Sequence, residues 1–554
     1  MKFSNKILSQ TLVQLCLDKG IDHIVISPGS RSAPLTISFG EHPDFKCFSI
    51  VDERCAAFFA LGIAQQLKKP VAVVCTSGSA LLNYYPAVVE AFYSDIPLVV
   101  ISADRPKNYI DIGDGQTIRQ ENVFENHILY SANCIEGDDF QIKNETEINV
   151  ALNTAIELNG PVHLNIPFSE PLYHTSENQM VWPQNVAARL DREILEEDLE
   201  PFLSKWNPSK RKMILVGVLP PNSVEQRFVE QLAKDESVLV LTETTSNLHN
   251  ERFITAIDQL IAPLRDEDFR ELQPDILLTF GGMVVSKKIK AFLRSFPPKQ
   301  HWHVDTKKAF DTYFVLTHHF KTTVNNFFVK FLPKTTAVES DYQKHWLATK
   351  QYRLQRHQAY ESEILYSDFI VFCEIFHNLP QNIQLQLSNS ATIRYAQLFE
   401  IPPSAEVFCN RGTSGIDGST STAVGAAYAS KLPTVFITGD LSFFYDSNAL
   451  WNNYIPKNFK VIVVNNSGGG IFRILPGEKD TQLFDTYFET KHNLSAKQLS
   501  EMYGFKYETI HAKEDLAIRL KKFFNIKEEP ALLEIFTPSN VNDKVLLDYF
   551  KFIL

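Results

Sequence analysis

Short apolar runs that end at loops of small or polar residues recur along the chain and constrain its fold more than any other feature. In the first part of the chain they cover residues 24–26, 48–51, 71–74 and 98–101, with helical patterns between them. Because these runs are apolar throughout except at Ser49, they are typical of strands buried on both faces of a sheet. Such strands, separated by helices, predict an α/β fold with mostly parallel sheets.

The alternation occurs in three successive blocks, separated by polar stretches near residues 175–210 and 333–350. Further apolar runs in the second and third blocks are residues 213–218, 238–241, 276–282, 383–387, 435–437, 461–464 and 532–535. A chain of 554 residues has room for about three or four domains of ordinary size. We therefore predict three tandem α/β domains, over residues 1–185, 186–340 and 341–554.

Charge and cysteine usage exclude several classes of protein. The 54 basic and 65 acidic residues give a formal charge of -11, so nucleic acid and anionic membranes are not expected partners. Any anion must therefore be bound by a local basic cluster. No apolar run approaches the roughly 18–20 residues of a membrane span. Seven scattered cysteines without a CxxC pair favour reduced thiols in the core, and we expect a cytoplasmic protein.

Two pairs of polar residues follow predicted strands of the third block. Gly439-Asp440 comes after the run at 435–437, and Asn465-Asn466 comes after the run at 461–464. Open α/β sheets bind ligands at the carboxyl ends of their strands, and carboxylate and amide oxygens suit Mg²⁺. Gly468 opens a run of three glycines that would let a backbone carbonyl join these ligands. Taken singly, each pair is equally explained as turn residues.

Together these pairs resemble the signature of thiamine-diphosphate-dependent enzymes, which opens with Gly-Asp-Gly and closes with Asn-Asn. The third position here is Leu441. The superfamily also has a glutamate that hydrogen-bonds N1′ of the aminopyrimidine and promotes deprotonation of C2, and Glu53 matches it, with residues 76–80 resembling the adjacent turn. Without that resemblance, Glu53 is explained as an acidic residue in the first turn of a helix.

Further motifs narrow the resemblance to one family, in which Leu is usual at that third position. The motifs are residues 27–34, 102–106, 115–120, 410–418 and 439–442. They resemble the 2-succinyl-5-enolpyruvyl-6-hydroxy-3-cyclohexene-1-carboxylate (SEPHCHC) synthases of menaquinone biosynthesis. The resemblance runs through all three predicted domains and is densest in the first and third.

The resemblance implies a thiamine-diphosphate-binding fold and a carbon–carbon bond-forming transferase. With thiamine diphosphate and Mg²⁺ or Mn²⁺, such an enzyme decarboxylates 2-oxoglutarate and adds the resulting carbanion to isochorismate, the cofactor acting as electron sink. The superfamily places its cofactor between the N-terminal domain of one subunit and the C-terminal domain of another. The resemblance therefore implies a homodimer that pairs further into a homotetramer.

The residues that match family positions fall into three sets. The metal would be held by Asp440, the side chain of Asn466 and the carbonyl of Gly468. The cofactor would contact Glu53, Asn389, Ser390, Ile416, Gly439, Ser442 and Asn466. Ile416 would force the cofactor into its bent form, and N–H groups at the strand-to-helix junction 389–390 could bind the diphosphate.

Both substrates are dicarboxylates, so the third set contains the local basic cluster that a chain of charge -11 requires. Arg394 and Arg411 match residues around the 2-oxoglutarate-derived group, and the other matches are Ser30, Arg31, Arg105, Gln116 and Lys287 toward isochorismate, with Ser390, Ile471 and Phe472 in the substrate pocket. Each cation is also explained as a solvated charge or an internal ion pair. The family often has Asn where this chain has Gly115, and residues 476–494 are a predicted lid.

Two alternatives remain at the level of the sequence. One is another thiamine-diphosphate decarboxylase or carboligase, such as an acetohydroxyacid synthase acting on pyruvate. The basic set argues against it, because pyruvate has a single carboxylate. The other is a protein that binds the cofactor without catalysis. The presence of Glu53 together with the metal-binding pairs argues against that, because binding alone needs no proton relay at the aminopyrimidine.

Overall fold

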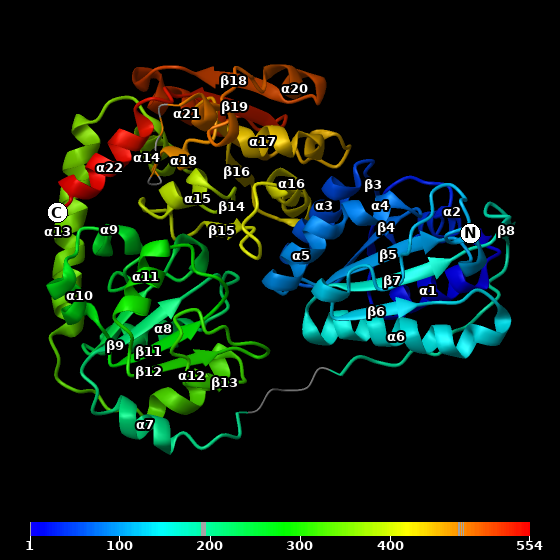
Figure 1. Ribbon diagram of the computed structural model, residues 1–554, viewed down its shortest axis with the longest axis horizontal. Coiled ribbons are helices and arrows are strands. Elements are labelled where there is room, and N and C mark those ends of the chain that lie inside the picture. The colour runs from blue at the N-terminus through cyan, green and yellow to red at the C-terminus, as the bar shows by residue number, and fades with distance from the viewer. Residues whose placement is uncertain (1, 190–194, 475–476, 478, 480) are drawn as a thin grey trace.

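The chain forms three α/β units, described by a computed structural model over residues 2–189, 195–474, 477, 479 and 481–554 (Figure 1). Each unit is built on one sheet whose paired strands are all parallel. The strands at the centre of each sheet are buried on both faces, with helices packed on either side. The predicted α/β fold with mostly parallel sheets is confirmed.

The N-terminal unit has a six-stranded sheet in the order β3-β2-β4-β5-β7-β6. Its strands are β2 (His23–Ile26), β3 (Lys46–Ser49), β4 (Val71–Cys75), β5 (Leu98–Asp104), β6 (Tyr130–Asn133) and β7 (Val162–Pro167). Its helices are α1 (Ile7–Asp18), α2 (Ala33–Gly40), α3 (Glu53–Leu67), α4 (Ser79–Asn83), α5 (Tyr85–Ser94) and α6 (Gln141–Leu158). A small antiparallel pair joins β1 (Phe3–Ser4) to β8 (Thr175–Ser176).

The central unit has a five-stranded sheet in the order β10-β9-β11-β12-β13. Its strands are β9 (Lys212–Val216), β10 (Val238–Leu241), β11 (Ile276–Phe280), β12 (Gln300–Val304) and β13 (His318–Phe320). Its helices are α7 (Glu200–Trp206), α8 (Gln226–Lys234), α9 (Ile257–Ile261), α10 (Asp266–Leu272), α11 (Lys287–Ser295) and α12 (Val324–Phe331). The long helix α13 (Tyr342–Glu363) then runs along the central unit to the C-terminal one (Figure 1).

The C-terminal unit has a six-stranded sheet in the order β15-β14-β16-β17-β19-β18. Its strands are β14 (Gln384–Leu387), β15 (Glu406–Cys409), β16 (Thr434–Gly439), β17 (Phe459–Asn465), β18 (Lys506–Ile510) and β19 (Ala531–Phe536). Its helices are α14 (Asp368–His377), α15 (Ala391–Ala396), α16 (Ser419–Ala429), α17 (Asp440–Tyr445), α18 (Ile471–Ile474), α19 (Gln482–Tyr487), α20 (Lys497–Met502), α21 (Leu516–Phe524) and α22 (Asn542–Phe552).

Most predicted runs coincide with observed strands, including the edge strand β10, whereas the central strands β7 and β12 were not predicted. The run expected at 48–51 corresponds to strand β3, which begins and ends two residues earlier. This edge strand begins with the exposed Lys46, so its start is not marked by an apolar residue. The predicted domain boundaries at 185/186 and 340/341 fall between the sheets and remain predictions.

The seven cysteines are free thiols, of which Cys47 is half-buried and the others are buried. Among the described residues, no helix is long and apolar enough to cross a membrane.

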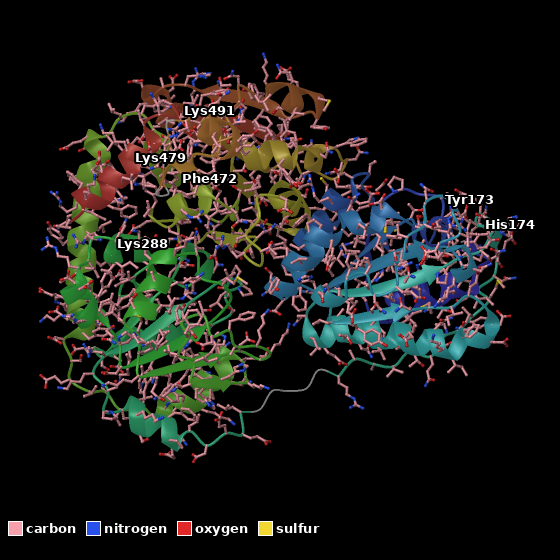
Figure 2. All side chains as sticks on the ribbon, in the orientation of Figure 1. Tyr173, His174, Lys288, Phe472, Lys479 and Lys491 are labelled. Atoms are coloured by element: carbon pink, nitrogen blue, oxygen red, sulfur yellow. The ribbon has the colours of Figure 1, made fainter. Side chains whose placement is uncertain are left out.

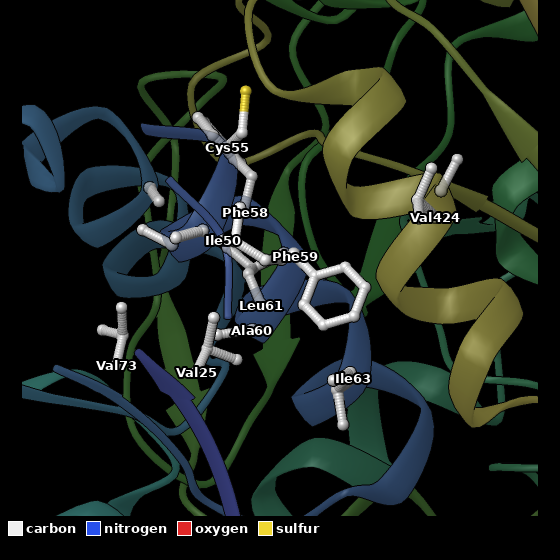
Figure 3. Close-up of a cluster of buried hydrophobic side chains, with 14 of the residues drawn as sticks. Val25, Ile50, Cys55, Phe58, Phe59, Ala60, Leu61, Ile63, Val73 and Val424 are labelled. Atoms are coloured by element: carbon white, nitrogen blue, oxygen red, sulfur yellow. The ribbon is translucent and has the colours of Figure 1, made fainter. Parts of the chain in front are cut away.

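The N-terminal and C-terminal units are joined by a close crossing of α3 and α16. A Cβ atom on Gly62 would lie 2.2 Å from the carbonyl oxygen of Thr422, and one on Gly425 would lie 2.0 Å from that of Phe59. Glycine at both positions therefore lets the two helix backbones approach. Figure 3 shows Val424 of α16 on the side of the cluster toward which Phe59 points, and both belong to one buried core.

We expect Gly425→Ala to destabilise the protein by about 1–3 kcal/mol, because the added methyl group would meet backbone and not a movable side chain. The measurement is chemical unfolding of the two proteins. Gly40→Ala is the matched control, since a Cβ at that helix end has no heavy atom within 4 Å. Equal losses of stability in the two variants would contradict the close helix crossing.

Candidate functional site

Asp440 and Gly468 meet at the carboxyl ends of the neighbouring strands β16 and β17. The Gly468 N–H donates to Asp440 Oδ2 at 3.0 Å, and the Leu441 N–H donates to Asp440 Oδ1 at 2.7 Å. Gly468 has a φ of 155°, and a Cβ there would lie 2.6 Å from the carbonyl oxygen of Glu489. Glycine is therefore required for this approach, as the glycine run predicts.

Asn466 completes this group with an unpaired oxygen. Its Nδ2 donates to Asp368 Oδ2 at 2.8 Å, which directs Oδ1 the other way. That Oδ1 is buried without a hydrogen-bond partner among the described residues. Burying an amide oxygen unpaired costs free energy, and a coordinated cation would remove that cost. The residues at this sheet edge therefore fit a divalent metal.

Two residues of this group were not predicted from the sequence. Asp368, at the start of α14, is buried, accepts from Thr537 Oγ1 at 2.5 Å, and its pKa is raised to about 6 chiefly by burial. His492 Nε2 lies 3.3 Å from Asp440 Oδ2. Neither residue follows a strand, so their roles become visible only when distant segments are brought together.

The residues matched to the diphosphate and the cofactor ring surround one loop, 410–416. Asn389 Nδ2 donates to the carbonyl oxygens of Asn410 at 2.7 Å and Gly415 at 2.8 Å. Ser442 Oγ donates to the Ile416 carbonyl at 2.7 Å, and the Ile416 side chain is exposed. Asn389 and Ser442 thus position the loop that presents Ile416.

Ser390 and Gly439 line the same sheet edge. Ser390 has a φ of 67° and comes directly before α15, while Gly439 is the last residue of β16. A Cβ on Gly439 would meet no heavy atom within 4 Å, so open space lies beside it. The structure therefore brings together all the C-terminal residues that match cofactor positions.

Arg411 belongs to this loop, and Arg394, near the end of the neighbouring helix α15, is close enough for the two charges to interact. Arg411 Nη1 donates to Asn389 Oδ1 at 2.7 Å, and Arg394 Nη1 donates to the Ser390 carbonyl at 2.5 Å. Burial, and then the charge of Arg411, lowers the pKa of Arg394. The buried Arg411 Nε has no hydrogen-bond partner among the described residues. Two partly buried guanidinium groups with unused donors favour binding of a carboxylate.

The loop that carries Arg411 is fixed from the N-terminal unit. Glu90 of α5 is buried and accepts from the backbone N–H groups of Gly412 at 2.8 Å and Thr413 at 2.7 Å. A buried carboxylate with these bonds rigidly connects the two units at the site. The sequence analysis did not identify Glu90, because its helix is far from the loop in the chain.

Lys287 lies on the central unit's side of the same neighbourhood. It is exposed at the start of α11. Burial lowers the pKa of Lys290 most, the negative charge of Glu243 opposes this, and the positive charges of Arg411 and Lys287 add to the lowering. Lys290 and Arg411 both line a cavity of about 580 Å³ at the junction of the three units. The sequence analysis missed Lys290 and Glu243, although Glu243 follows strand β10.

The other residues matched to isochorismate lie at the carboxyl ends of the strands of the N-terminal sheet. The Arg31 N–H donates to Thr76 Oγ1 at 3.2 Å, its Nη1 donates to the Phe168 carbonyl at 2.8 Å, and Ser30 beside it is exposed. Arg105 Nη1 is 3.5 Å from Asp114 Oδ2, and Gln116 has a φ of 55°. Arg31 is thus largely engaged within its own unit. Gly115 has open space where an Asn side chain would fit.

Glu53 opens α3, and its hydrogen-bond partner lies in its own unit. Asp52 Oδ1 accepts from the Cys55 N–H at 3.2 Å and caps the helix, while Asn83 Nδ2 donates to Glu53 Oε2 at 3.3 Å. Within the described part of the chain, no hydrogen bond or ion pair joins Glu53 to the C-terminal unit.

Ile471 and Phe472 lie on the short helix α18 next to the glycine run. Phe472 carbon atoms lie 3.1 Å from where a Cβ of Gly469 would stand, and Figure 2 labels Phe472 in the C-terminal unit. Residues 476, 478 and 480 of the predicted lid lie outside the described residues. The described part includes α19 and is tied to α18 by an ion pair of Arg473 with Glu489. The lid itself remains a prediction.

Comparison with known proteins shows the family of this chain. Three models match in succession: the N-terminal TPP binding domain of thiamine pyrophosphate enzymes over residues 7–128, their middle domain over 170–387 and their C-terminal TPP binding domain over 390–535. The chain is 58% identical to the SEPHCHC synthase of Flavobacterium johnsoniae, over 98% of each chain. The chain belongs to the SEPHCHC synthase family.

Other SEPHCHC synthases extend the similarity. That of Flavobacterium psychrophilum is 57% identical over 98% of each chain, and that of Porphyromonas gingivalis is 37% identical over 100% of this chain and 98% of the relative. The predicted family, its enzyme class in menaquinone biosynthesis and the thiamine diphosphate cofactor are confirmed. The metal, the oligomer and the roles of individual site residues remain predictions.

Proposed function

We propose that this chain catalyses the thiamine-diphosphate-dependent decarboxylation of 2-oxoglutarate and the conjugate addition of the resulting succinyl carbanion to isochorismate. The product is SEPHCHC. The observation that carries the proposal is the adjacent pair Arg394 and Arg411 beside Asn389. The buried Arg411 Nε has no hydrogen-bond partner among the described residues, so it is available to a substrate carboxylate. When bound, thiamine diphosphate supplies the electron sink for the carbanion.

Asp440, Asn466 and the carbonyl of Gly468 would hold Mg²⁺ or Mn²⁺. The unpaired Asn466 Oδ1 and the close approach of Gly468 to Asp440 support this assignment. Asn389, Ser390, Ile416, Gly439 and Ser442 would line the cofactor. Asn389 and Ser442 hold the loop that presents Ile416, and Ser390 and Gly439 lie at the same sheet edge. Asp368 would orient the Asn466 amide through its hydrogen bond and is a positioning residue.

Different cationic side chains would bind the two substrates. Arg394 and Arg411 would bind the distal carboxylate of 2-oxoglutarate, with Ser390, Ile471 and Phe472 beside it. The matches toward isochorismate are Ser30, Arg31, Arg105, Gln116 and Lys287. The position of Lys287 near Lys290, which also interacts with Arg411, supports its place in a shared anion-binding pocket.

Glu53 would hold and move the proton at N1′ of the aminopyrimidine. Because the superfamily places its cofactor between the N-terminal domain of one subunit and the C-terminal domain of another, we infer that Glu53 of one chain serves the C-terminal site of a second chain. This arrangement requires a homodimer, and the family resemblance extends it to a homotetramer. Measuring the molar mass in solution tests the oligomer, and a monomer with full activity would contradict it.

Replacing Arg394 or Arg411 by Ala should remove a charge-assisted hydrogen bond worth about 1.5–3 kcal/mol. That corresponds to roughly a 10- to 150-fold loss in kcat/KM for 2-oxoglutarate. Arg31→Ala and Arg105→Ala should leave decarboxylation largely intact and impair the reaction with isochorismate. The measurement is single-turnover carbon dioxide release, followed by product formation once isochorismate is added.

The exposed Arg227 on α8 provides the control variant, Arg227→Ala, which should change neither step. If Arg394→Ala and Arg411→Ala release carbon dioxide normally while Arg31→Ala and Arg105→Ala do not, the division of the pocket is reversed. If all four behave like the control, the arginines are structural and the substrate assignment is wrong.

Assaying carbon dioxide release from 2-oxoglutarate and from pyruvate tests the proposed function directly. We expect release from 2-oxoglutarate and, with isochorismate present, SEPHCHC. Release from pyruvate alone would favour a different decarboxylase or carboligase. Cofactor binding without release from either acid would favour a non-catalytic protein.

A further inference from the structure

Away from the site described above, three metal-binding side chains meet where α13 is followed by α14. Glu361, near the end of α13, faces Cys373 and His377 on α14, and the ligand atoms of the three side chains lie within 4.8 Å of one another. Cys373 and His377 are four residues apart, so they share one helix face. The sequence analysis treated Cys373 as a core thiol only.

The spacing of the sulfur and nitrogen atoms matches tetrahedral coordination. Cys373 Sγ and His377 Nδ1 are 3.5 Å apart. A tetrahedral Zn²⁺ with Zn–S of about 2.3 Å and Zn–N of about 2.0–2.1 Å separates the two ligand atoms by roughly 3.6 Å. The two side chains are therefore already placed for a shared cation, without movement of either helix.

The third group, Glu361, is oriented by a buried histidine. His357 Nε2 lies 2.9 Å from Glu361 Oε1, and Gln259 Nε2 donates to His357 Nδ1 at 3.2 Å. With Nδ1 accepting, the proton of His357 is on Nε2 and faces the carboxylate. Glu361 Oε1 is buried beside this imidazole, which holds the carboxylate in place. Carboxylates that bind metals are commonly held in place by hydrogen bonds of this kind.

The cluster is reachable from solvent. His377 is exposed, Glu361 is half-buried and Cys373 is buried, so a cation would enter past the imidazole. A cavity of about 120 Å³ is lined by His357, Glu361 and His377. This provides room for a water molecule as a further ligand.

We propose that Glu361, Cys373 and His377 bind one divalent transition-metal ion, for which Zn²⁺ is the best suited. Thiolate, imidazole and carboxylate together favour Zn²⁺ over the hard cations Mg²⁺ and Ca²⁺. On binding, the S–H bond of Cys373 breaks, a sulfur–metal bond forms and the proton leaves to solvent, with no change of oxidation state. The site is separate from the oxygen-ligand group around Asp440.

A metal at this site would clamp α13 to α14. Helix α14 begins at Asp368, which accepts from Asn466 Nδ2, so the clamp would hold the helix that supports the proposed magnesium ligand. The competing explanation is a plain hydrogen bond from the Cys373 thiol to His377 Nδ1 or to Glu361. Burial, together with the charge of Glu361, raises the pKa of this thiol, so the cation must displace its proton.

Titration of the full chain with Co²⁺, under reducing conditions and with excess Mg²⁺, tests the proposal. We expect the near-ultraviolet charge-transfer absorption of a thiolate bound to Co²⁺, saturating at one Co²⁺ per chain. The group around Asp440 has no sulfur and cannot produce this absorption. Zn²⁺ should then displace Co²⁺ and abolish the absorption, because Zn²⁺ binds such ligands more tightly.

Matched variants locate the site. Cys373→Ser should abolish the absorption, and His377→Ala, at an exposed position, should weaken Co²⁺ binding at least roughly 10- to 100-fold. Cys47→Ser, which changes a half-buried thiol of β3, is the control and should leave the titration unchanged. If Cys373→Ser does not fold, Glu361→Gln and His377→Ala decide. No thiolate absorption in the wild type at millimolar Co²⁺, or absorption that persists in these variants, would overturn the proposal.

Discussion

Glu53→Gln is expected to lower kcat/KM by about 100- to 10,000-fold while leaving the fold and cofactor affinity nearly unchanged. Glutamine keeps the shape of glutamate, and its amide oxygen can still accept from Asn83 Nδ2. It cannot, however, share a proton with N1′ of the aminopyrimidine. Loss of a charge in the first turn of α3 should cost only about 0.3–1 kcal/mol of stability.

The decisive measurement is exchange of the C2 proton of bound thiamine diphosphate. We expect exchange to slow in Glu53→Gln and to stay at the wild-type rate in the control Glu41→Gln, an exposed glutamate that follows α2. Unfolding curves of both variants separate catalysis from helix stability. Wild-type exchange in Glu53→Gln would show that Glu53 serves only the helix terminus.

Asp440→Ala is expected to lower the affinity for thiamine diphosphate with Mg²⁺ by more than roughly 100-fold. Even residues that only support metal ligands cost about 10- to 100-fold when they are replaced, and Asp440 is a proposed ligand. Without the Asp440 carboxylate, the Gly468 N–H loses its acceptor. The diphosphate would then face the Asn466 oxygen with no metal cation between them.

Calorimetric titration with thiamine diphosphate, with and without Mg²⁺, measures this loss. Asp548→Ala, which removes a surface carboxylate of α22, is the control and should bind as the wild type does. Metal dependence should disappear together with the affinity in Asp440→Ala. If the variant retains wild-type affinity in Mg²⁺, the Gly439-Asp440 pair is a structural turn and the metal assignment is wrong.

Most fully buried strands could be predicted because their signal is local. Residues 71–74 and 461–464 are apolar at every position, since both faces of β4 and β17 are buried. Strand β18 was missed because Lys506–Ile510 lies at a sheet edge and buries only its last residue. An edge strand can remain polar, so its sequence resembles a loop.

The candidate site was partly predictable for the same reason. Asp440 and Asn466 follow apolar runs directly, and parallel strands bring their carboxyl ends to one edge. The sequence also led to the family, because its motifs are continuous segments. The supports of the site, such as Asp368 and Glu90, come from other elements and carry no local mark.

By itself, the sequence determined the alternation of strands and helices, the polar residues at strand ends and the family. Only the tertiary structure decided which distant groups meet: the α3–α16 crossing at Gly62 and Gly425, the unpaired oxygen of Asn466, and the cluster of Cys373 with Glu361. The physical reason is that periodicity and turn chemistry depend on neighbours in the chain. Contacts between units depend on how buried surfaces pack, which no short segment encodes.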